Sequence, residues 1–379
     1  MIKLILMHLL ISIRYKMKNL LFIILLTIIN SSSFAQLDLP AAANNPRATL
    51  SEEVGITSIT LKYSRPDVNG REGKIWGSLV PYGFTTTNFV TNKSNSPWRA
   101  GANENTTISF EHDVKIEGKS IAAGTYALSM AVWPDSVIVI FSKANDAWGS
   151  FYYEDKNDAL RVTVKPQVND KSVEYLKYEF IEHKEKSCTI ALEWEKLIIP
   201  FKVDVDVENI VIAKLREQVT SQKGFNQLNL VSAAQYCINK NINLDEALAW
   251  SQRASALRSY PTLTTLANAY TKLNKLAQAD SVINEVGAIA TAPQYAQYAR
   301  TLIGQKRVDK ALEFITAAKT KFGELPAINT ALAYVYSAKG DFMKAIEAAT
   351  KALAQAPNDA AKKSTQALID KLKENKDIN

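Results

Sequence analysis

The chain is poor in the residues that most often build catalytic and metal centres. Its 379 residues include three histidines and two cysteines. Neither His112 nor His183 stands at the short distance from a second ligand that is typical of a zinc site. The Gly-x-Ser-x-Gly sequence that positions a hydrolase nucleophile is also absent. The sequence therefore indicates no catalytic residue, no metal ligand and no cofactor. It favours a non-enzymatic role and leaves enzymatic activity open.

The scarcity of cysteine excludes a framework of disulfide bonds. Cys188 and Cys237 fall in two different predicted domains, so a bond between them would have to join those domains. We expect both to be ordinary buried side chains. Each domain is then held by its own hydrophobic core, which a content of 47% hydrophobic residues allows.

The positive charge is smaller than the formal value of +7 suggests. Residues 1–35 contain four basic side chains and no acidic one, and the rest of the chain has 41 basic and 38 acidic side chains. A net charge of +3 gives no electrostatic footprint for nucleic acid. We therefore expect no nucleic-acid partner.

The N-terminus has the pattern of an export signal. Lys16 and Lys18 precede the apolar run Leu20–Ile29, and Ser33-Phe34-Ala35 offers small residues at a cleavage site. This run is too short to span a bilayer, which takes about 20 apolar residues. We expect translation to begin at Met17, residues 1–35 to be removed, and the mature chain to be exported to the periplasm or cell surface without a membrane span. The alternative is one long N-terminal anchor interrupted by charges.

The first half of the chain predicts antiparallel β structure. Apolar residues alternate with polar ones, as in Ile59, Leu61 and Tyr63, and turn residues separate the runs. Nine short strands without long helices between them favour a sandwich or barrel. The predicted strands are 57–63, 106–110, 114–117, 125–131, 137–142, 160–164, 173–181, 188–195 and 197–203.

The second half contains an internal repeat. Small residues recur at spacings of 32, 32 and 34, and a large side chain stands nine residues before each of them. The small residues are Ala247, Ala279, Ala311 and Ala345, and the large ones are Ile238, Tyr270, Leu302 and Tyr336. A period near 34 built from two helices resembles the tetratricopeptide repeat. Residues 361–372 predict an amphipathic helix that covers the last repeat.

The predicted architecture is an antiparallel β-sandwich-like domain followed by an all-α repeat solenoid. Its parts are a signal peptide (1–35), the β domain (37–205), a linker helix (206–222), four repeats (223–359) and a capping helix (360–375).

One short motif could suggest phosphate binding. Gly118-Lys119-Ser120 matches the end of a phosphate-binding loop, but position 113 is aspartate instead of the required glycine. The flanking residues predict strands, so we interpret this stretch as a hairpin turn.

Six ordered motifs in the β half resemble a bacterial domain-of-unknown-function family, the one numbered 2911. The motifs are Tyr63–Pro66, Gly70-Arg71, Pro81–Gly83, Trp98–Glu104, Ala123–Leu128 and Trp148–Tyr153. The resemblance covers roughly residues 45–203, and Phe84 to Ser96 is an insertion relative to the family pattern. The family implies no assigned activity.

The polar and aromatic residues of these motifs allow two interpretations. Arginines could pair with Glu104 inside a structural network, with Arg99 as its expected neighbour, or the set could line a site for a sugar or an anion. The second interpretation is the alternative function, a binding protein or an enzyme. The candidate ligand-binding residues are Arg65, Arg71, Trp98, Arg99, Asn103 and Glu104.

The repeats carry the leading functional prediction, which is recognition of a protein or peptide by an exported scaffold. The first helix of each repeat normally lines a concave groove. The candidate groove residues are Tyr236, Asn239, Asn268, Thr271, Arg300 and Tyr334. The alternative is that this face is only solvated.

Overall fold

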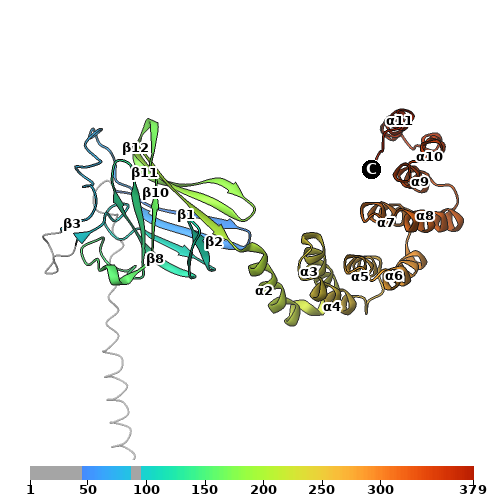
Figure 1. Ribbon diagram of the computed structural model, residues 1–379, viewed down its shortest axis with the longest axis horizontal. Helices are drawn as coiled ribbons and strands as arrows, with labels where there is room; N and C mark the ends of the chain where they lie inside the picture. The colour runs from blue at the N-terminus through green and yellow to red at the C-terminus, as the bar shows by residue number, and fades with distance from the viewer. Residues whose placement is uncertain (1–44, 87–94) are drawn as a thin grey trace, which may run out of the picture. The chain divides into compact units, whose positions relative to one another are not determined.

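A computed structural model describes residues 45–86 and 95–379. The chain divides into a β unit, which ends at Val207, and a helical unit, which begins at Glu208 (Figure 1). The predicted signal peptide, residues 1–35, lies outside the described residues. Among the described residues, no helix combines the length and the hydrophobicity that a bilayer crossing requires.

The β unit consists of two larger antiparallel sheets and a small pair. One sheet has the strand order β1-β2-β5-β8-β9-β10, the second has the order β11-β12-β6-β7, and β3 pairs with β4. The strands are β1 (Arg47–Val54), β2 (Thr57–Ser64), β3 (Thr85–Thr86), β4 (Asn95–Ser96), β5 (Thr107–Phe110), β6 (Val114–Ile116), β7 (Lys119–Ile121), β8 (Gly124–Val132), β9 (Val137–Ser142), β10 (Asp158–Val164), β11 (Gln167–Lys184) and β12 (Ser187–Val205).

Aromatic pairs join the two larger sheets. Tyr63 of β2 and Tyr178 of β11 meet edge to face at 4.8 Å between ring centroids. Phe141 of β9 and Phe201 of β12 meet in the same way at 5.9 Å. The buried aromatic and aliphatic side chains therefore fill the space between two facing sheets, which confirms the predicted sandwich-like fold.

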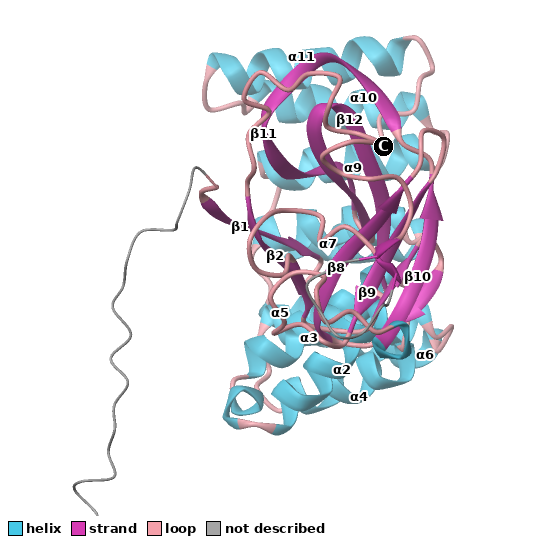
Figure 2. Cartoon of the chain, turned by 90° about the vertical axis from the view of Figure 1, so that its left-hand side faces the viewer, coloured by secondary structure: helices cyan, strands magenta, loops and turns pink. Residues whose placement is uncertain are grey.

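The structure differs from the sequence prediction at β12 and at four strands that the sequence did not predict, β1, β3, β4 and β7. Residues 188–195 and 197–203 form one long strand, β12, because Glu195 adopts a left-handed conformation (φ 51°) that bends the strand without ending it. Figure 2 shows β11 and β12 as long curved strands. The sequence does not predict β1 because this strand lies at a sheet edge, where half of its side chains are exposed, one is buried and the apolar alternation is weak.

The turn at Gly118 is the hairpin that the sequence predicts. Ile116 pairs with Lys119 across it, and Glu117 (φ 48°) and Gly118 (φ 78°) both have positive φ, as a tight two-residue turn requires. No helix follows, so the geometry is not that of a phosphate-binding loop.

The helical unit is a series of antiparallel helix pairs. Its helices are α2 (Val207–Thr220), α3 (Gln227–Lys240), α4 (Leu244–Ala254), α5 (Tyr260–Lys272), α6 (Leu276–Ile289), α7 (Ala292–Gly304), α8 (Val308–Phe322), α9 (Pro326–Ala338), α10 (Phe342–Ala354) and α11 (Asp359–Lys373). The pairs α3–α4, α5–α6, α7–α8 and α9–α10 form four repeats, and α11 packs on α10. Figure 1 shows α3, α5, α7 and α9 in an inner row, with their partners outside.

The recurring alanines explain the close pairing of the helices. Ala247, Ala279, Ala311 and Ala345 are fully buried in α4, α6, α8 and α10, the second helices of the four repeats. A side chain of this size lets the backbones of a pair approach closely. At the end of the array, Ile369 and Leu372 of α11 are buried, as expected for a capping helix.

Candidate functional site

Arg65 and Arg71 of the β unit lie in the segment that follows β2. Arg65 donates from Nε to the carbonyl oxygen of Leu176 at 2.8 Å, and its guanidinium lies 5.7 Å from the centre of the Tyr175 ring. Arg71 donates to the carbonyl oxygen of Val68 and forms an ion pair of 3.1 Å with Asp67. Both arginines thus fasten this segment, to β11 and to itself.

Trp98 belongs to a cluster of three tryptophans. Its ring stacks on that of Trp194 at 6.0 Å and meets Trp76 edge to face at 5.6 Å. Its indole N–H donates to the carbonyl oxygen of Gly101 at 3.2 Å. With both its ring and its donor in use inside the domain, Trp98 supports the loop that follows it.

Arg99 and Asn103 close that loop. Arg99 donates to the carbonyl oxygen of Asn103 at 2.5 Å, and its guanidinium lies 5.1 Å from the centre of the Phe151 ring. Burial lowers the pKa of Arg99. Asn103 has φ 59°, a left-handed conformation that asparagine tolerates better than most residues, and its side chain accepts a hydrogen bond from Asn45.

Glu104 pairs with a residue that the sequence did not suggest. Its Oε1 atom accepts from Nε of Arg47 at 2.7 Å. The ion pair therefore joins Glu104 to β1, whereas the sequence predicts Arg99 as its neighbour. The other oxygen, Oε2, is buried and has no hydrogen-bond partner among the described residues.

Glu104 also lines a cavity of about 360 Å³. Basic and acidic side chains surround the cavity. Of the six candidate ligand-binding residues, all of which the structure describes, Glu104 is the one that lines it. The lining residues are Arg47, Ala48, Thr49, Lys62, Tyr63, Glu104, Asn105, Thr107, Asn145, Asp146 and Ala147. The other candidates lie in two loops and do not meet there. The pairing of β1 with β2, which sets Arg47 beside Ser64 and Thr49 beside Lys62, creates this site, and a weakly patterned edge strand gives no sequence signal for it.

The cysteines have the inert character expected of them. Both are unbonded and buried, one in each unit. Burial raises the pKa of Cys188 to about 12 and that of Cys237 to about 11, so neither is a thiolate at neutral pH. In the part of the chain that the structure describes, no three histidine, cysteine or acidic side chains gather closely enough to hold a metal ion.

A second and larger cavity, of about 520 Å³, lies in the helical unit between α2 and α3. Apolar side chains dominate its walls and a few polar groups stand among them. The lining residues are Val211, Leu215, Gln218, Val219, Lys223, Asn229, Ser232, Ala233 and Tyr236. Of the candidate groove residues, Tyr236 lines this cavity. Asn239 is exposed one turn further along α3. The sequence gives no sign that α2 forms a wall of this cavity, because α2 precedes the repeats and its position predicts a linker helix.

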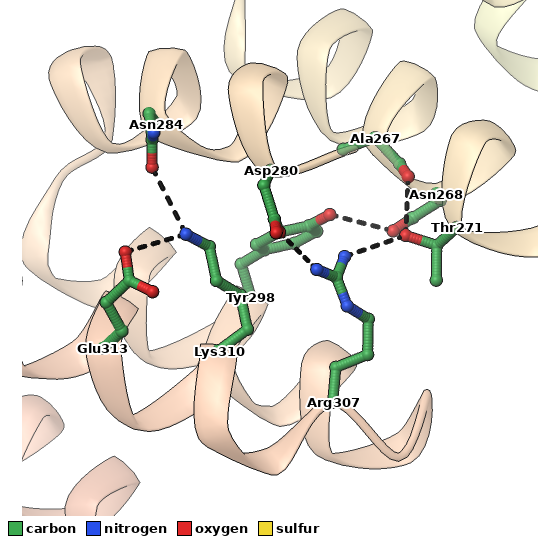
Figure 3. Close-up of polar contacts among 9 residues, drawn as sticks. All are labelled: Ala267, Asn268, Thr271, Asp280, Asn284, Tyr298, Arg307, Lys310 and Glu313. Carbon is green, nitrogen blue, oxygen red and sulfur yellow. Dashed lines mark hydrogen bonds and ion pairs between the residues drawn. The ribbon is translucent and has the colours of Figure 1, made fainter. Parts of the chain in front are cut away.

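Asn268 and Thr271 face the next repeat and are engaged there (Figure 3). Asn268 accepts hydrogen bonds from the Tyr298 hydroxyl at 3.0 Å and from Gln305 at 2.9 Å. Thr271 accepts from Arg307 at 3.2 Å, and Arg307 also forms an ion pair with Asp280. These side chains hold the second and third repeats together, so a variant at Asn268 would disturb the array as well as its surface.

Arg300 and Tyr334 meet on the inner row of helices. The Arg300 guanidinium, from α7, lies 3.9 Å from the centre of the Tyr334 ring of α9. Arg300 is exposed and Tyr334 is half-buried. This cation–π pair places a positive charge on the surface that the third and fourth repeats share.

The sequence comparisons agree with both resemblances. Residues 45–203 match the model of the family described as "Protein of unknown function (DUF2911)", and residues 326–359 match the tetratricopeptide repeat. The order of the two matches is the one that the motifs predict. No protein of curated function matches the chain in sequence.

Solved structures of repeat proteins align with about two fifths of the chain. One is TTC0263, a thermophilic tetratricopeptide-repeat protein of Thermus thermophilus, with 21% identity over 43% of this chain and 91% of that one, at a TM-score of 0.30. Another is YrrB, whose title names a tetratricopeptide-repeat protein with an unusual peptide-binding site, with 14% identity over 42% and 84% of the two chains, at 0.26.

Proposed function

We propose, from a tetratricopeptide-repeat array preceded by a β domain of unknown function, that this chain is an exported, non-enzymatic scaffold whose solenoid binds a protein or peptide partner. Repeats of this kind form extended concave binding surfaces, because each repeat contacts only its neighbours and exposes the same helix face. The presence of these repeats makes the chain a protein-interaction scaffold.

The cavity between α2 and α3 is the observation that supports partner binding most directly. Its volume, about 520 Å³, lies within the range of ligand pockets and could take one large apolar side chain of a partner. Val211, Leu215 and Val219 line one wall, while Lys223 offers a donor for a peptide backbone. An apolar centre with polar groups around it is the usual anatomy of a protein-binding hot spot.

The proposal of export depends on the N-terminal sequence alone. Lys16, Lys18, the apolar run Leu20–Ile29 and the small residues at Ser33 and Ala35 support it. The partner would then be a protein of the periplasm or the cell surface, and we propose no nucleic-acid partner and no cofactor.

A tryptophan introduced at the cavity tests the proposal. Ser232 is exposed on α3, lines the cavity and donates only to its own helix, at the carbonyl of Leu228. Ser364 is its matched control, because it is exposed on α11 and donates to Ala361 of its own helix in the same way. We expect Ser232→Trp to abolish capture of a partner from an envelope extract of the native host, as identified by mass spectrometry, and Ser364→Trp to leave capture unchanged. Equal capture by both variants would exclude this cavity as the binding site.

A small polar ligand in the cavity beside Glu104 is the second candidate function. Arg47 and Lys62 supply positive charge and donors there, and the Oε2 atom of Glu104 accepts no hydrogen bond from the described residues. A panel of sugars and inorganic anions should then raise the melting temperature of the full chain, and Arg47→Ala combined with Lys62→Ala should remove the effect. Absence of any shift across the panel would argue against this candidate.

A further inference from the structure

The residues after α11 fold back onto α9. The Ser337 hydroxyl donates to Oδ1 of Asp377 at 2.6 Å and accepts from the backbone N–H of Ile378 at 3.1 Å. The side-chain amide of Asn379 donates to the carbonyl oxygen of Tyr334 at 3.0 Å. Figure 1 shows this end of the chain on the side of α9 that faces away from α10.

Asp377, Ile378 and Asn379 make three different kinds of contact with the repeat. The Asp377 carboxylate accepts from Ser337 and also from the side-chain amide of Asn379 at 2.7 Å. Ile378 is half-buried and packs against the core of the helical unit. The Asp377 carboxylate, the Ile378 backbone N–H and the Asn379 amide thus contact the same short stretch of α9, as an extended peptide ligand would, while the Ile378 side chain packs against the core of the helical unit.

The surroundings on the inner row favour an acidic peptide. Arg300 holds its positive charge over the Tyr334 ring, on the helix that carries Ser337. Ser337 lies one turn after Tyr334, a residue that the sequence assigns to the groove, and it is only 3% exposed with Asp377 and Ile378 bonded to it.

We propose that the surface formed by Tyr334 and Ser337 is a peptide subsite for an Asp–aliphatic–Asn sequence, and that residues 377–379 occupy it until a partner segment of that chemistry displaces them. The proposal rests on the proposed function, since it assigns a preferred sequence to the partner of the solenoid. A tethered segment acts at an effective concentration on the order of millimolar, so it competes well with a weak partner and poorly with a tight one. The segment would thereby set the minimum affinity of partners that bind the fourth repeat.

A detached copy of the segment provides the test. The probe is a synthetic peptide with the sequence of residues 374–379, added at about 1 mM and observed by saturation-transfer difference NMR, a concentration matched to the effective one. The proteins are the full chain, a chain that lacks residues 376–379, and full-length Asp377→Ala, which frees the subsite without shortening the chain. We expect the signal on the isoleucine methyl groups to be about two- to tenfold stronger with both altered proteins than with the full chain, because the internal competitor is weakened or gone.

Two controls decide whether the peptide binds at α9. Ser337→Ala in the shortened chain should abolish the signal, and Thr350→Ala should not, since Thr350 is exposed on α10 and donates only to its own helix, at Ile346. A peptide with alanine in place of its aspartate should also fail to bind. Equal signals with the full and the altered chains, no signal with any of them, or a signal that survives Ser337→Ala would each overturn the proposal. The outcome is separable from that of the Ser232→Trp experiment, which probes a cavity on α3 and can succeed or fail by itself.

Discussion

Tyr298 and Asn268 are hydrogen-bonded across the junction of the second and third repeats, with the phenol oxygen 3.0 Å from Oδ1 (Figure 3). Tyr298 is 2% exposed and Asn268 is half-buried, so the hydrogen bond is largely shielded from water. The groove surface of this part of the solenoid depends on polar contacts between repeats as well as on apolar packing.

Tyr298→Phe should lower the free energy of unfolding by about 1 kcal/mol, the usual net value of one hydrogen bond, because Asn268 retains Gln305 as a donor. Urea denaturation of the two proteins at pH 7 measures it. Burial raises the pKa of Tyr298 above the ordinary value of 10.0. The stabilisation is therefore complete below pH 10 and is lost as the pH rises above it, because the unfolded chain ionises first. We expect the difference between wild type and variant to shrink above that pH, and a constant difference would contradict the assignment.

Gly149→Ala should destabilise the β unit by more than Gly70→Ala. Both glycines have positive φ, 62° and 70°, so both substitutions carry the backbone strain of about 1 kcal/mol. A Cβ atom at Gly149 would also lie 2.4 Å from Cζ of Arg99, whereas one at Gly70 would meet nothing within 4 Å. Displacing Arg99 adds about 1–3 kcal/mol of overpacking, which thermal denaturation of the two variants would detect. Equal melting temperatures would show that Arg99 moves aside freely.

Docking of the C-terminal segment should be lost in acid. Burial acts to raise the pKa of Asp377, but the hydrogen bonds from Ser337 and Asn379 outweigh it and the pKa lies below the ordinary value of 3.8. A lowered pKa stabilises the docked form above pH 3.8, and this contribution disappears as the pH falls through the lowered value. Hydrogen exchange of the Ile378 N–H should therefore be slower in wild type than in Asp377→Asn at pH 6, and the difference should shrink as the pH is lowered below 3.8. Equal exchange at pH 6 would contradict a docked carboxylate.

The predicted signal peptide ends at Ala35, so we expect the mature chain to start at Gln36. Intact-mass spectrometry of the protein isolated from its native host should find this N-terminus, with or without cyclisation of the glutamine. Ala35→Arg should block processing, because a signal-peptide cleavage site requires a small residue there. A native protein that keeps Met17 would refute the prediction.

Local patterns were enough to predict the two-part architecture. The alternation at Ile59, Leu61 and Tyr63 predicts a half-buried strand because side chains along a strand point to opposite faces. The spacing of Ala247 and its three counterparts predicts paired helices because each close crossing needs a small side chain at the same place. Both signals lie within one element or one repeat, where sequence separation and spatial separation are linked.

The candidate sites could be predicted only in part, because they depend on contacts between residues far apart in the chain. Glu104 pairs with Arg47 instead of Arg99, since the edge pairing of β1 brings a residue 57 positions away closer than one five positions away. Asn268 has the spacing of a groove residue, yet the packing of α7 turns it into an acceptor for Tyr298.

The amino-acid sequence by itself determined the class of each half, the repeat period, the hairpin at Gly118 and the scarcity of catalytic side chains. The tertiary structure alone decided which side chains are free to bind. In the folded chain Arg65 and Arg71 donate to nearby backbone carbonyls, a cavity lies between α2 and α3, and Asp377 accepts a hydrogen bond from Ser337. The physical reason is that periodicity fixes which face of an element is buried, whereas the partner of a polar side chain depends on which donors and acceptors the folded chain brings within about 3 Å of it.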